Sequence, residues 1–258
     1  MVTFGPGDEV MRHASLAILL LLTAASSAAA QQPRATPDFL FGEPRGSFGI
    51  RGSWVFARAD SDVFDFLQTH LTIDPGAFDA PGIAADLGFA VTPRLDAVVG
   101  FEFSQASAAS EYRAFVDNDR RPIEQTTRLR EANLSGTMRV MLLPRGVAIS
   151  RLAWIPRRVA PYVGAGGGLL WYDFTQIGDF IDVGSRNMAV FSDVFTSRGW
   201  TPSAHALGGV DVRVHRRMYV TVEGRYLWAA ARLERRFEGF DPIDLAGLRL
   251  SAGINLLF

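Results

Sequence analysis

The chain has 258 residues, a formal net charge of −1 and no cysteine. The absence of cysteine excludes disulfides, thiol nucleophiles and cysteine-type metal sites. The near-zero charge, with acidic and basic residues interspersed, argues against a nucleic-acid partner.

The first 30 residues have the pattern of a secretory signal peptide. Arg12 precedes a short apolar run, and small residues then lead to Ala28–Ala30 before Gln31. The run is shorter than the roughly 20 apolar residues that a bilayer span needs, so a cleaved signal is favoured over a membrane anchor. Residues 1–10 do not fit such a signal, which makes Met11 a candidate translation start. Residues 31–45 are expected to form a short periplasmic lead-in.

The rest of the chain is predicted to be all-β, because apolar and polar residues alternate with a period of two in eight segments. These segments cover residues 47–58, 82–92, 95–105, 131–143, 161–172, 203–214, 218–230 and 248–258. Residues 60–81, 106–123 and 173–200 are predicted as long loops, the first with a short amphipathic helix over Val63–Leu71. The connection 144–160 carries apolar residues and is expected to cover the floor of the fold.

The last segment indicates where the two faces of each strand point. Its apolar residues alternate with Arg249, Ser251, Gly253 and Asn255, and it ends on Phe258. Apolar residues toward lipid and polar ones toward a lumen are typical of a transmembrane barrel, whereas a water-soluble barrel reverses the faces. We therefore predict an eight-stranded antiparallel transmembrane β-barrel over residues 46–258.

Aromatic residues near the outer ends of the four upward strands support this prediction. They are expected to form a girdle at the outer interface. The girdle residues are Trp54, Phe56, Phe101, Phe103, Trp171, Tyr226 and Trp228.

The chain resembles the small outer-membrane β-barrel superfamily, the OmpA/OmpW-type barrel domains. A terminal Phe258 on an alternating strand with Ile254 and Leu256 looks like the sorting signal of such barrels, and Pro161–Gly168 resembles a stretch common at the start of their fifth strand. The resemblance implies the cell outer membrane as location and the barrel-assembly machinery as a partner. It names no reaction, and the chain ends at the barrel, without the periplasmic peptidoglycan-binding domain of OmpA proper.

Charged residues on the inward face are expected to form a salt-bridged network that fills the lumen. Buried charges are tolerated when they pair, and an eight-stranded barrel is just wide enough for side chains to fill it. The predicted network comprises Arg51, Asp86, Asp96, Glu102, Arg139, Asp211, Arg213, Glu223, Arg225 and Arg249. The alternative is a narrow conducting pathway or gate.

An enzymatic role is not favoured. Some eight-stranded barrels are lipid A deacylases with a Ser-His-acid site on the lipid-facing surface, and Ser203, His205 and Glu223 lie on neighbouring predicted strands. Alternation points these side chains into the lumen, where a nucleophile has no access to substrate. His70 and His215 have no partners at metal-ligand spacing, so neither a metal nor a cofactor is expected.

Two further features concern the outer end. One is a set of apolar residues in two of the predicted loops: Phe64, Phe66 and Leu67 in the first, and Phe191, Val194 and Phe195 in the other. They form either an apolar mouth for small hydrophobic molecules, as is thought for OmpW-type barrels, or a cap packed on itself and on lipopolysaccharide. We favour the cap. Arg128 and Arg130 lie on the lipid-facing parity and are candidates for contact with lipid phosphates. The sequence thus predicts a non-enzymatic barrel with an envelope-structural or surface-interaction role, and passage of small solutes as the alternative.

Overall fold

The computed structural model describes residues 39–116, 120–150, 153–181 and 190–258. The predicted signal peptide and the first part of the lead-in lie outside these residues. From Phe39 onward the chain is one compact unit.

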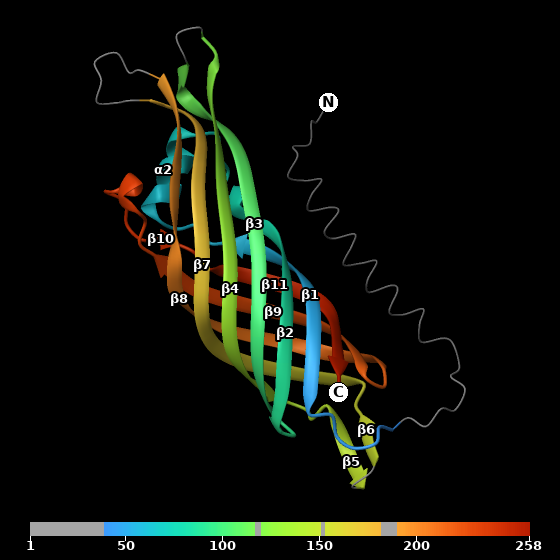
Figure 1. The fold of residues 1–258 in the computed structure, drawn as a ribbon. Helices are drawn as coiled ribbons and strands as arrows, with labels where there is room; N and C mark the ends of the chain where they lie inside the picture. The colour runs from blue at the N-terminus through green and yellow to red at the C-terminus, as the bar shows by residue number, and fades with distance from the viewer. Residues whose placement is uncertain (1–38, 117–119, 151–152, 182–189) are drawn as a thin grey trace, which may run out of the picture. The chain divides into compact units, whose positions relative to one another are not determined.

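Eight antiparallel strands form a closed ring (Figure 1). Its order is β9-β11-β1-β2-β3-β4-β7-β8, and β8 pairs with β9 to close it. The strands are β1 (Gly46–Ala57), β2 (Ala80–Thr92), β3 (Leu95–Val116), β4 (Pro122–Met141), β7 (Val159–Ile181), β8 (Val190–His215), β9 (Met218–Ala231) and β11 (Gly247–Leu257). The predicted fold class is therefore confirmed.

The register of the ring sets its width. A line of paired residues that starts at Trp228 on β9 passes once round the ring and returns to β9 at Met218, ten residues from its start. The path is Trp228, Ala204, Gly167, Gly136, Val99, Leu87, Phe48, Leu256 and Met218. With a rise of about 3.3 Å per residue and about 4.8 Å between strands, this stagger tilts the strands by about 40°. A barrel of eight strands at this tilt is narrow enough for its own side chains to fill.

The outer wall of the ring is apolar over a length that matches a membrane. On β1 every outward residue from Phe48 to Phe56 is apolar or glycine, and the same holds from Leu95 to Phe103 on β3 and from Val163 to Trp171 on β7. Each stretch covers nine residues, and a transmembrane β-strand needs about 9–11. The wall exposes large side chains throughout, for example Ile50 at 59% and Ile83 at 66%. A surface of this kind is suited to lipid.

Two predicted loops are wrong. Residues 106–116 continue β3 and residues 122–130 begin β4, while residues 173–181 continue β7 and residues 190–200 begin β8. These four strands therefore project beyond the rest of the ring (Figure 1). The apolar pattern of the outward face stops at the membrane boundary, but the backbone pairing does not.

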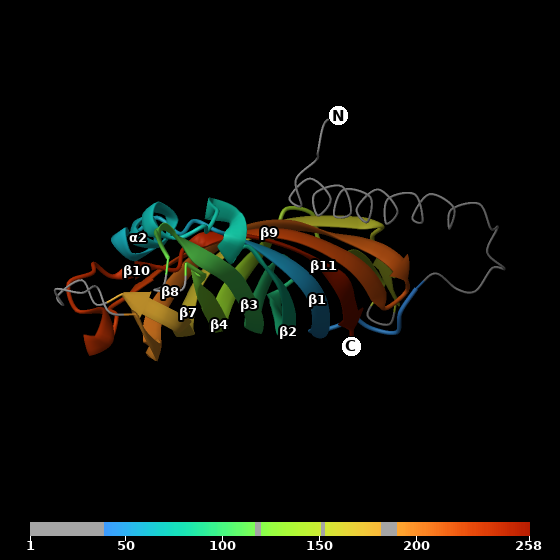
Figure 2. The ribbon, with the colours of Figure 1, turned by 90° about the horizontal axis from the view of Figure 1, so that it is seen from above.

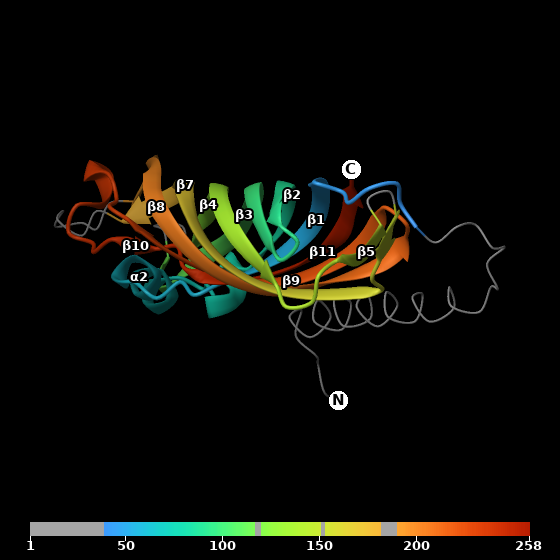
Figure 3. The same ribbon diagram turned by 90° about the horizontal axis from the view of Figure 1, so that it is seen from below.

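Smaller elements close the two ends of the ring. At the outer end lie α2 (Asp62–His70), η2 (Pro75–Phe78), η3 (Arg235–Phe237) and the short β10 (Ile243–Asp244). At the inner end β5 (Gly146–Ser150) and β6 (Ala153–Pro156) form a separate hairpin. Figures 2 and 3 show α2 at the end of the barrel opposite to the C-terminus. The predicted helix over residues 63–71 is thus confirmed, with bounds shifted by one residue.

Candidate functional site

The middle of the lumen is filled by a charge cluster centred on Glu223. One of its oxygens, Oε2, contacts Arg51 Nη1 at 3.3 Å and Arg139 Nη2 at 3.2 Å, and it accepts a hydrogen bond from the Tyr162 hydroxyl at 2.9 Å. The other oxygen, Oε1, contacts Arg225 Nη2 at 3.0 Å. Asp86 adds a second carboxylate, 2.8 Å from Arg51 and 3.6 Å from Arg139.

This cluster follows from strand parity. Its members lie on β1, β2, β4, β7 and β9, on the face opposite to the apolar wall, and each is at most 8% exposed. Buried carboxylates and guanidinium groups need partners to offset their loss of hydration. Three arginines against two carboxylates leave the cluster net positive, and they hold five strands together across the lumen.

A second cluster lies nearer the outer end of the spanning region. Arg249 Nη2 contacts Glu131 Oε2 at 2.5 Å, and its Nε lies 3.5 Å from Glu102 Oε2. All three residues are at most 7% exposed. One arginine therefore bridges β11 to both β3 and β4, from the opposite side of the ring.

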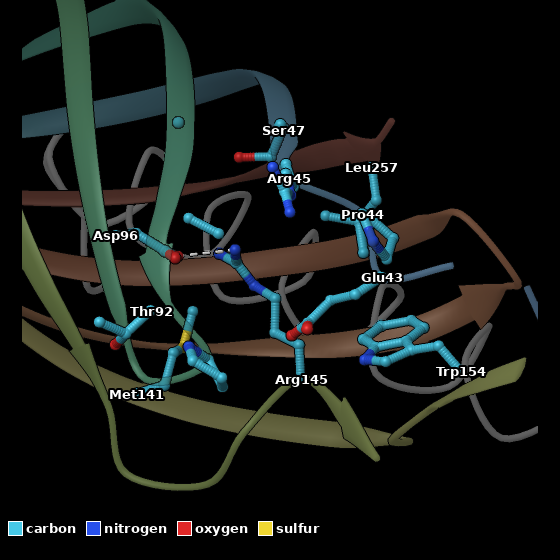
Figure 4. Close-up of a pocket in the computed structure, with 14 residues that line it drawn as sticks. Glu43, Pro44, Arg45, Ser47, Thr92, Asp96, Met141, Arg145, Trp154 and Leu257 are labelled. Atoms are coloured by element: carbon cyan, nitrogen blue, oxygen red, sulfur yellow. Dashed lines mark ion pairs between the residues drawn. The ribbon is translucent and has the colours of Figure 1, made fainter. Parts of the chain in front are cut away.

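The inner end is closed by a third cluster and by the hairpin β5–β6. Arg145 reaches into the barrel, where it contacts Asp96 at 2.7 Å and Asp211 at 3.2 Å, and Thr221 donates a hydrogen bond of 2.7 Å to Asp211. Figure 4 shows Arg145 pointing toward Asp96 in a small pocket beside Trp154. The cavity volume of this pocket is about 20 Å³, room for about one water molecule.

The lead-in forms part of the floor. Leu40 and Trp154 exchange two backbone hydrogen bonds, of 2.8 and 3.0 Å, and both side chains are buried with Tyr219 and Leu257. The prediction that the connection 144–160 covers the floor is therefore confirmed.

The outer end is closed by an apolar cap. Phe64 is 0% exposed and packs edge-to-face against Phe78 and Phe174, with ring centroids 4.7 and 6.1 Å apart. Phe174 in turn packs against Phe237 at 5.4 Å. We define the cap as the buried apolar cluster made by α2, η2, η3, β10 and the inward faces of the projecting strands. Among the described residues, the cap packs tightly above the charged lumen.

The structure places most of the predicted lumen charges and half of the predicted mouth residues inside the barrel. Of the ten lumen charges, nine are buried, while Arg213 is half-buried at the inner rim. Of the residues considered for an apolar mouth, Phe64 and Leu67 are buried in the cap and Phe195 packs on Phe180 and Phe237, whereas Phe66, Phe191 and Val194 are exposed. This supports the cap over the mouth.

Sequence reasoning missed three members of the lumen network: Glu131, Arg145 and Tyr162. Glu131 was assigned to the start of a strand without a face, and Arg145 lies in a connection that carries no alternation. Tyr162 has inward parity, opposite to Val163, and that signal was available in the sequence.

The predicted girdle residues all lie on the outward face. Trp54, Phe103, Trp171 and Tyr226 are half-buried, while Phe56, Phe101 and Trp228 are between 41% and 48% exposed. Trp200 on β8 was placed in a loop by the sequence prediction; it pairs with Trp171 and is 65% exposed.

The three residues considered for a lipid A deacylase do not form a catalytic group. Ser203 donates a hydrogen bond to Asn133 Oδ1 at 3.0 Å, and His205 Nε2 lies 2.9 Å from the Thr137 hydroxyl. Glu223 is bound by the three arginines and Tyr162. Because each group is bonded elsewhere and buried, this set has no nucleophile–base contact.

The described residues contain neither a candidate metal site nor a helix that could cross a membrane. Within residues 39–258, apart from the three gaps, no group of three or more His, Asp or Glu residues is placed to hold a metal ion. Over the same ranges, no helix has the length and hydrophobicity that would let it cross a bilayer.

No protein-family model matches the sequence, and a comparison with curated proteins also gives no match. Solved structures do resemble the chain. Neisserial surface protein A has a TM-score of 0.47 and 14% identity, over 82% of this chain and 97% of its own. OprG of Pseudomonas aeruginosa, an outer membrane protein, has a TM-score of 0.45 and 11% identity, over 84% of this chain and 98% of its own. Ail of Yersinia pestis, the attachment invasion locus protein, has a TM-score of 0.37 and 13% identity, over 84% and 100%.

The chain's own geometry decides its class. A closed antiparallel ring of eight strands carries an apolar wall of membrane height and buries its charges inside. This protein is therefore an eight-stranded antiparallel β-barrel whose exposed apolar wall is suited to a membrane.

Proposed function

We propose that this barrel has an envelope-structural and surface-interaction role, and that it acts through its outer surface rather than through its lumen. The observation that carries the proposal is the closure of the interior at successive levels. The apolar cap, the clusters of Arg249 and Glu223, and the floor with Arg145 and Trp154 follow one another along the lumen.

The projecting strands offer a rigid platform for such a role. The outer part of β7, from Asp173 to Ile181, pairs with β4 on one side and with β8 on the other. Nine residues at about 3.3 Å each extend about 30 Å along the strand direction. Because the inward face of this sheet is fixed by the cap, its outward face is held in one shape.

A polar row at the base of the platform lies where we propose contact with the lipid head groups. Gln105, Arg130, Asp173 and Arg198 are neighbours across β3, β4, β7 and β8. The row immediately below it, toward the membrane, contains Phe103, Trp171 and Trp200, the aromatic boundary of the apolar wall. Charged residues directly above an aromatic belt lie where lipid phosphates are found.

We propose lipopolysaccharide as the partner of this row. Arg130 Nε donates a hydrogen bond of 3.1 Å to Gln105 Oε1, and its Nη1 lies 4.0 Å from Asp173 Oδ2. Arg128, two residues further out on the same face of β4, is half-buried and outward-facing. Its Nε is buried and has no hydrogen-bond partner in the described structure. Guanidinium groups bind phosphate through paired hydrogen bonds, so Arg128 and Arg130 form the core of this proposed contact.

The experiment measures the heat-induced unfolding of the refolded barrel by gel mobility, in micelles with lipopolysaccharide or with its dephosphorylated form. We expect the phosphorylated form to raise the unfolding temperature, and Arg128→Ala with Arg130→Ala to remove most of that gain. The matched control is Arg232→Ala with Arg235→Ala, two exposed arginines outside the row. An equal gain in both double variants would contradict the proposed contact.

The proposal assigns no reaction to the protein. Ser203 and His205 are 8% and 2% exposed and are bonded inside the lumen. Passage of small solutes through the lumen is the alternative function, and no observation among the described residues favours it.

A further inference from the structure

We infer that the periplasmic hairpin β5–β6 and the arginines of the inner rim bind the anionic phospholipids of the inner leaflet of the membrane. The inference rests on the membrane-spanning wall and is independent of the proposal for the outer surface. Figures 1 and 3 show β5 at the same end of the barrel as the C-terminus.

The hairpin has two different faces. Trp154, opposite Ala148, is 3% exposed and belongs to the barrel floor. Val147 and Ile155 are opposite each other on the other face, and Ile149 follows at an irregularity of the strand pairing. These three side chains are 49%, 37% and 67% exposed. The floor therefore uses one face of the hairpin, and a β-branched apolar face is left uncovered.

A lead-in residue adds to this face. Leu40 pairs with Trp154 on the free edge of β6, so that the neighbouring Phe41 points away from the floor and is 82% exposed. Its ring packs edge-to-face on Phe39 at 5.3 Å. An apolar group of this size in water is unfavourable, and such surfaces mark contacts with another phase or partner.

Exposed apolar residues also lie just beyond the end of β4 and at the start of β7. Leu142 and Leu143 are 53% and 43% exposed, and Val159 is 47% exposed. Residues 144–145 and 157–158 separate them from the hairpin. The apolar face of the hairpin is therefore only a few residues of chain from the lipid-facing wall, which favours lipid, rather than a periplasmic protein, as the occupant.

The charge of the inner rim fits the same occupant. The inner connections of the ring each carry exposed arginine, and the exposed acidic side chain among the described residues there is Glu43. The arginines are Arg45, Arg94, Arg157, Arg158 and Arg217.

Backbone hydrogen bonds fix these positions: the Arg94 carbonyl accepts from Met141 N, that of Arg158 from Arg213 N, and that of Arg217 from Leu257 N. A ring of fixed cations beside an apolar surface attracts anionic head groups, and the arginine stems lie along the acyl boundary.

The test uses the absence of cysteine in the chain. Ile149→Cys and Ala148→Cys, made separately in the full-length mature barrel, each receive one spin label. The refolded proteins are placed in phosphatidylcholine vesicles with and without phosphatidylglycerol. Accessibility to oxygen, which concentrates in lipid, is compared with accessibility to a water-soluble nickel complex.

We expect the label at position 149 to be more accessible to oxygen and the label at position 148 to be more accessible to nickel. A nickel-accessible label at position 149 in both vesicles would overturn the inference and leave a protein partner as the occupant of this face.

The second readout is the selectivity of the barrel for phosphatidylglycerol over phosphatidylcholine, measured with spin-labelled lipids. Because each arginine near an anionic membrane surface contributes about fivefold, Arg157→Gln with Arg158→Gln should lower this selectivity by up to roughly 30-fold. Arg232→Gln with Arg235→Gln, at the outer end, is the matched control. Unchanged selectivity in the inner-rim variant would contradict the role of the arginines, whatever the depth of the label.

Discussion

The inward-facing side chains of the ring differ sharply between its membrane-spanning part and its outer projection. In the spanning part they are charged, with Arg139 at 0% and Glu223 at 2% exposure. In the projection the buried ones are uncharged and include large apolar residues, with Phe174 at 0% and Leu129 at 5%. Both regions belong to the same strands, for β4 carries Leu129 and Arg139 and β7 carries Phe174 and Tyr162.

The difference shows which part of each strand is surrounded by lipid and which part by water. Within the bilayer the apolar side chains face lipid, so the interior is left to polar groups that must pair with one another. Above the bilayer the outside is water, and the same strands then bury apolar residues as a soluble protein does. The inversion occurs between Ala132 and Arg130 on the outward face of β4.

The largest expected effect comes from deleting Phe258, because neither region forms unless the barrel inserts. Phe258 N donates to Gly46 O and Phe258 O accepts from Gly46 N, both at 2.9 Å, so the last residue closes the seam between β11 and β1. We expect secretion to continue and most of the protein to remain in the periplasm, as measured by fractionation and heat-modifiable mobility. Normal insertion of the truncated chain would contradict the role given to this residue.

Glu223→Ala is expected to destabilise the lumen by about 3–5 kcal/mol, because it leaves buried arginines without their shared carboxylate. The measurement is urea-induced unfolding of the refolded barrel. Arg225→Met is the comparison: it removes the contact to Oε1 and leaves those of Arg51, Arg139 and Tyr162 to Oε2. Equal losses in the two variants would show that Glu223 does not serve as a hub.

Phe64→Ala is expected to loosen the cap without unfolding the barrel. Removing a buried Phe costs about 3–5 kcal/mol, and here the loss falls on the local opening of α2. Hydrogen exchange of α2 measures it, while urea-induced unfolding of the ring should change little. Phe66→Ala is the matched control, since Phe66 lies on the same helix and is 39% exposed. A parallel loss of ring stability in Phe64→Ala would contradict the separation of the two regions.

The smallest effect is expected at Asp79, at the edge of the cap. Asp79 Oδ1 accepts a hydrogen bond of 3.0 Å from Ala57 N, and burial raises the pKa of this carboxyl above its usual value. A raised pKa in the folded state favours the neutral acid, so the contribution of Asp79 to stability is present at low pH and is lost as the pH rises through the raised value. Asp79→Asn keeps an acceptor and should flatten this dependence, measured as exchange of the cap between pH 4 and 8. A variant with the parent's pH dependence would exclude Asp79 as its source.

The spanning part could be predicted from the sequence because lipid imposes a strict period of two on its outer face. The eight predicted segments therefore match the ring within a few residues wherever that face is apolar. Residues 106–123 and 173–200 were misassigned because, above the membrane, outward positions such as Ser107 and Thr175 are free to be polar. The remaining signal lay on the inward face, at Leu129, Phe174 and Phe195, and it is too weak without knowledge of the cap.

The lumen network could be predicted only in part, for a related reason. Parity identifies which residues point inward but not which of them meet across the ring. The contact of Arg249 on β11 with Glu131 on β4 depends on the stagger of the whole barrel. Arg145 belongs to no strand of the ring, because it lies in the connection between β4 and the hairpin, and its side chain enters the lumen from there. The alternation of residues along a strand therefore could not reveal it.

The central claim is that the interior is closed, and single-channel conductance of the refolded mature barrel in a planar bilayer tests it most directly. Heat-modifiable gel mobility first establishes that the protein has folded. We predict a folded and electrically silent barrel, because the cap, the charge clusters and the floor fill the lumen. Steady, discrete openings of the intact protein would contradict this account and assign it to the channels.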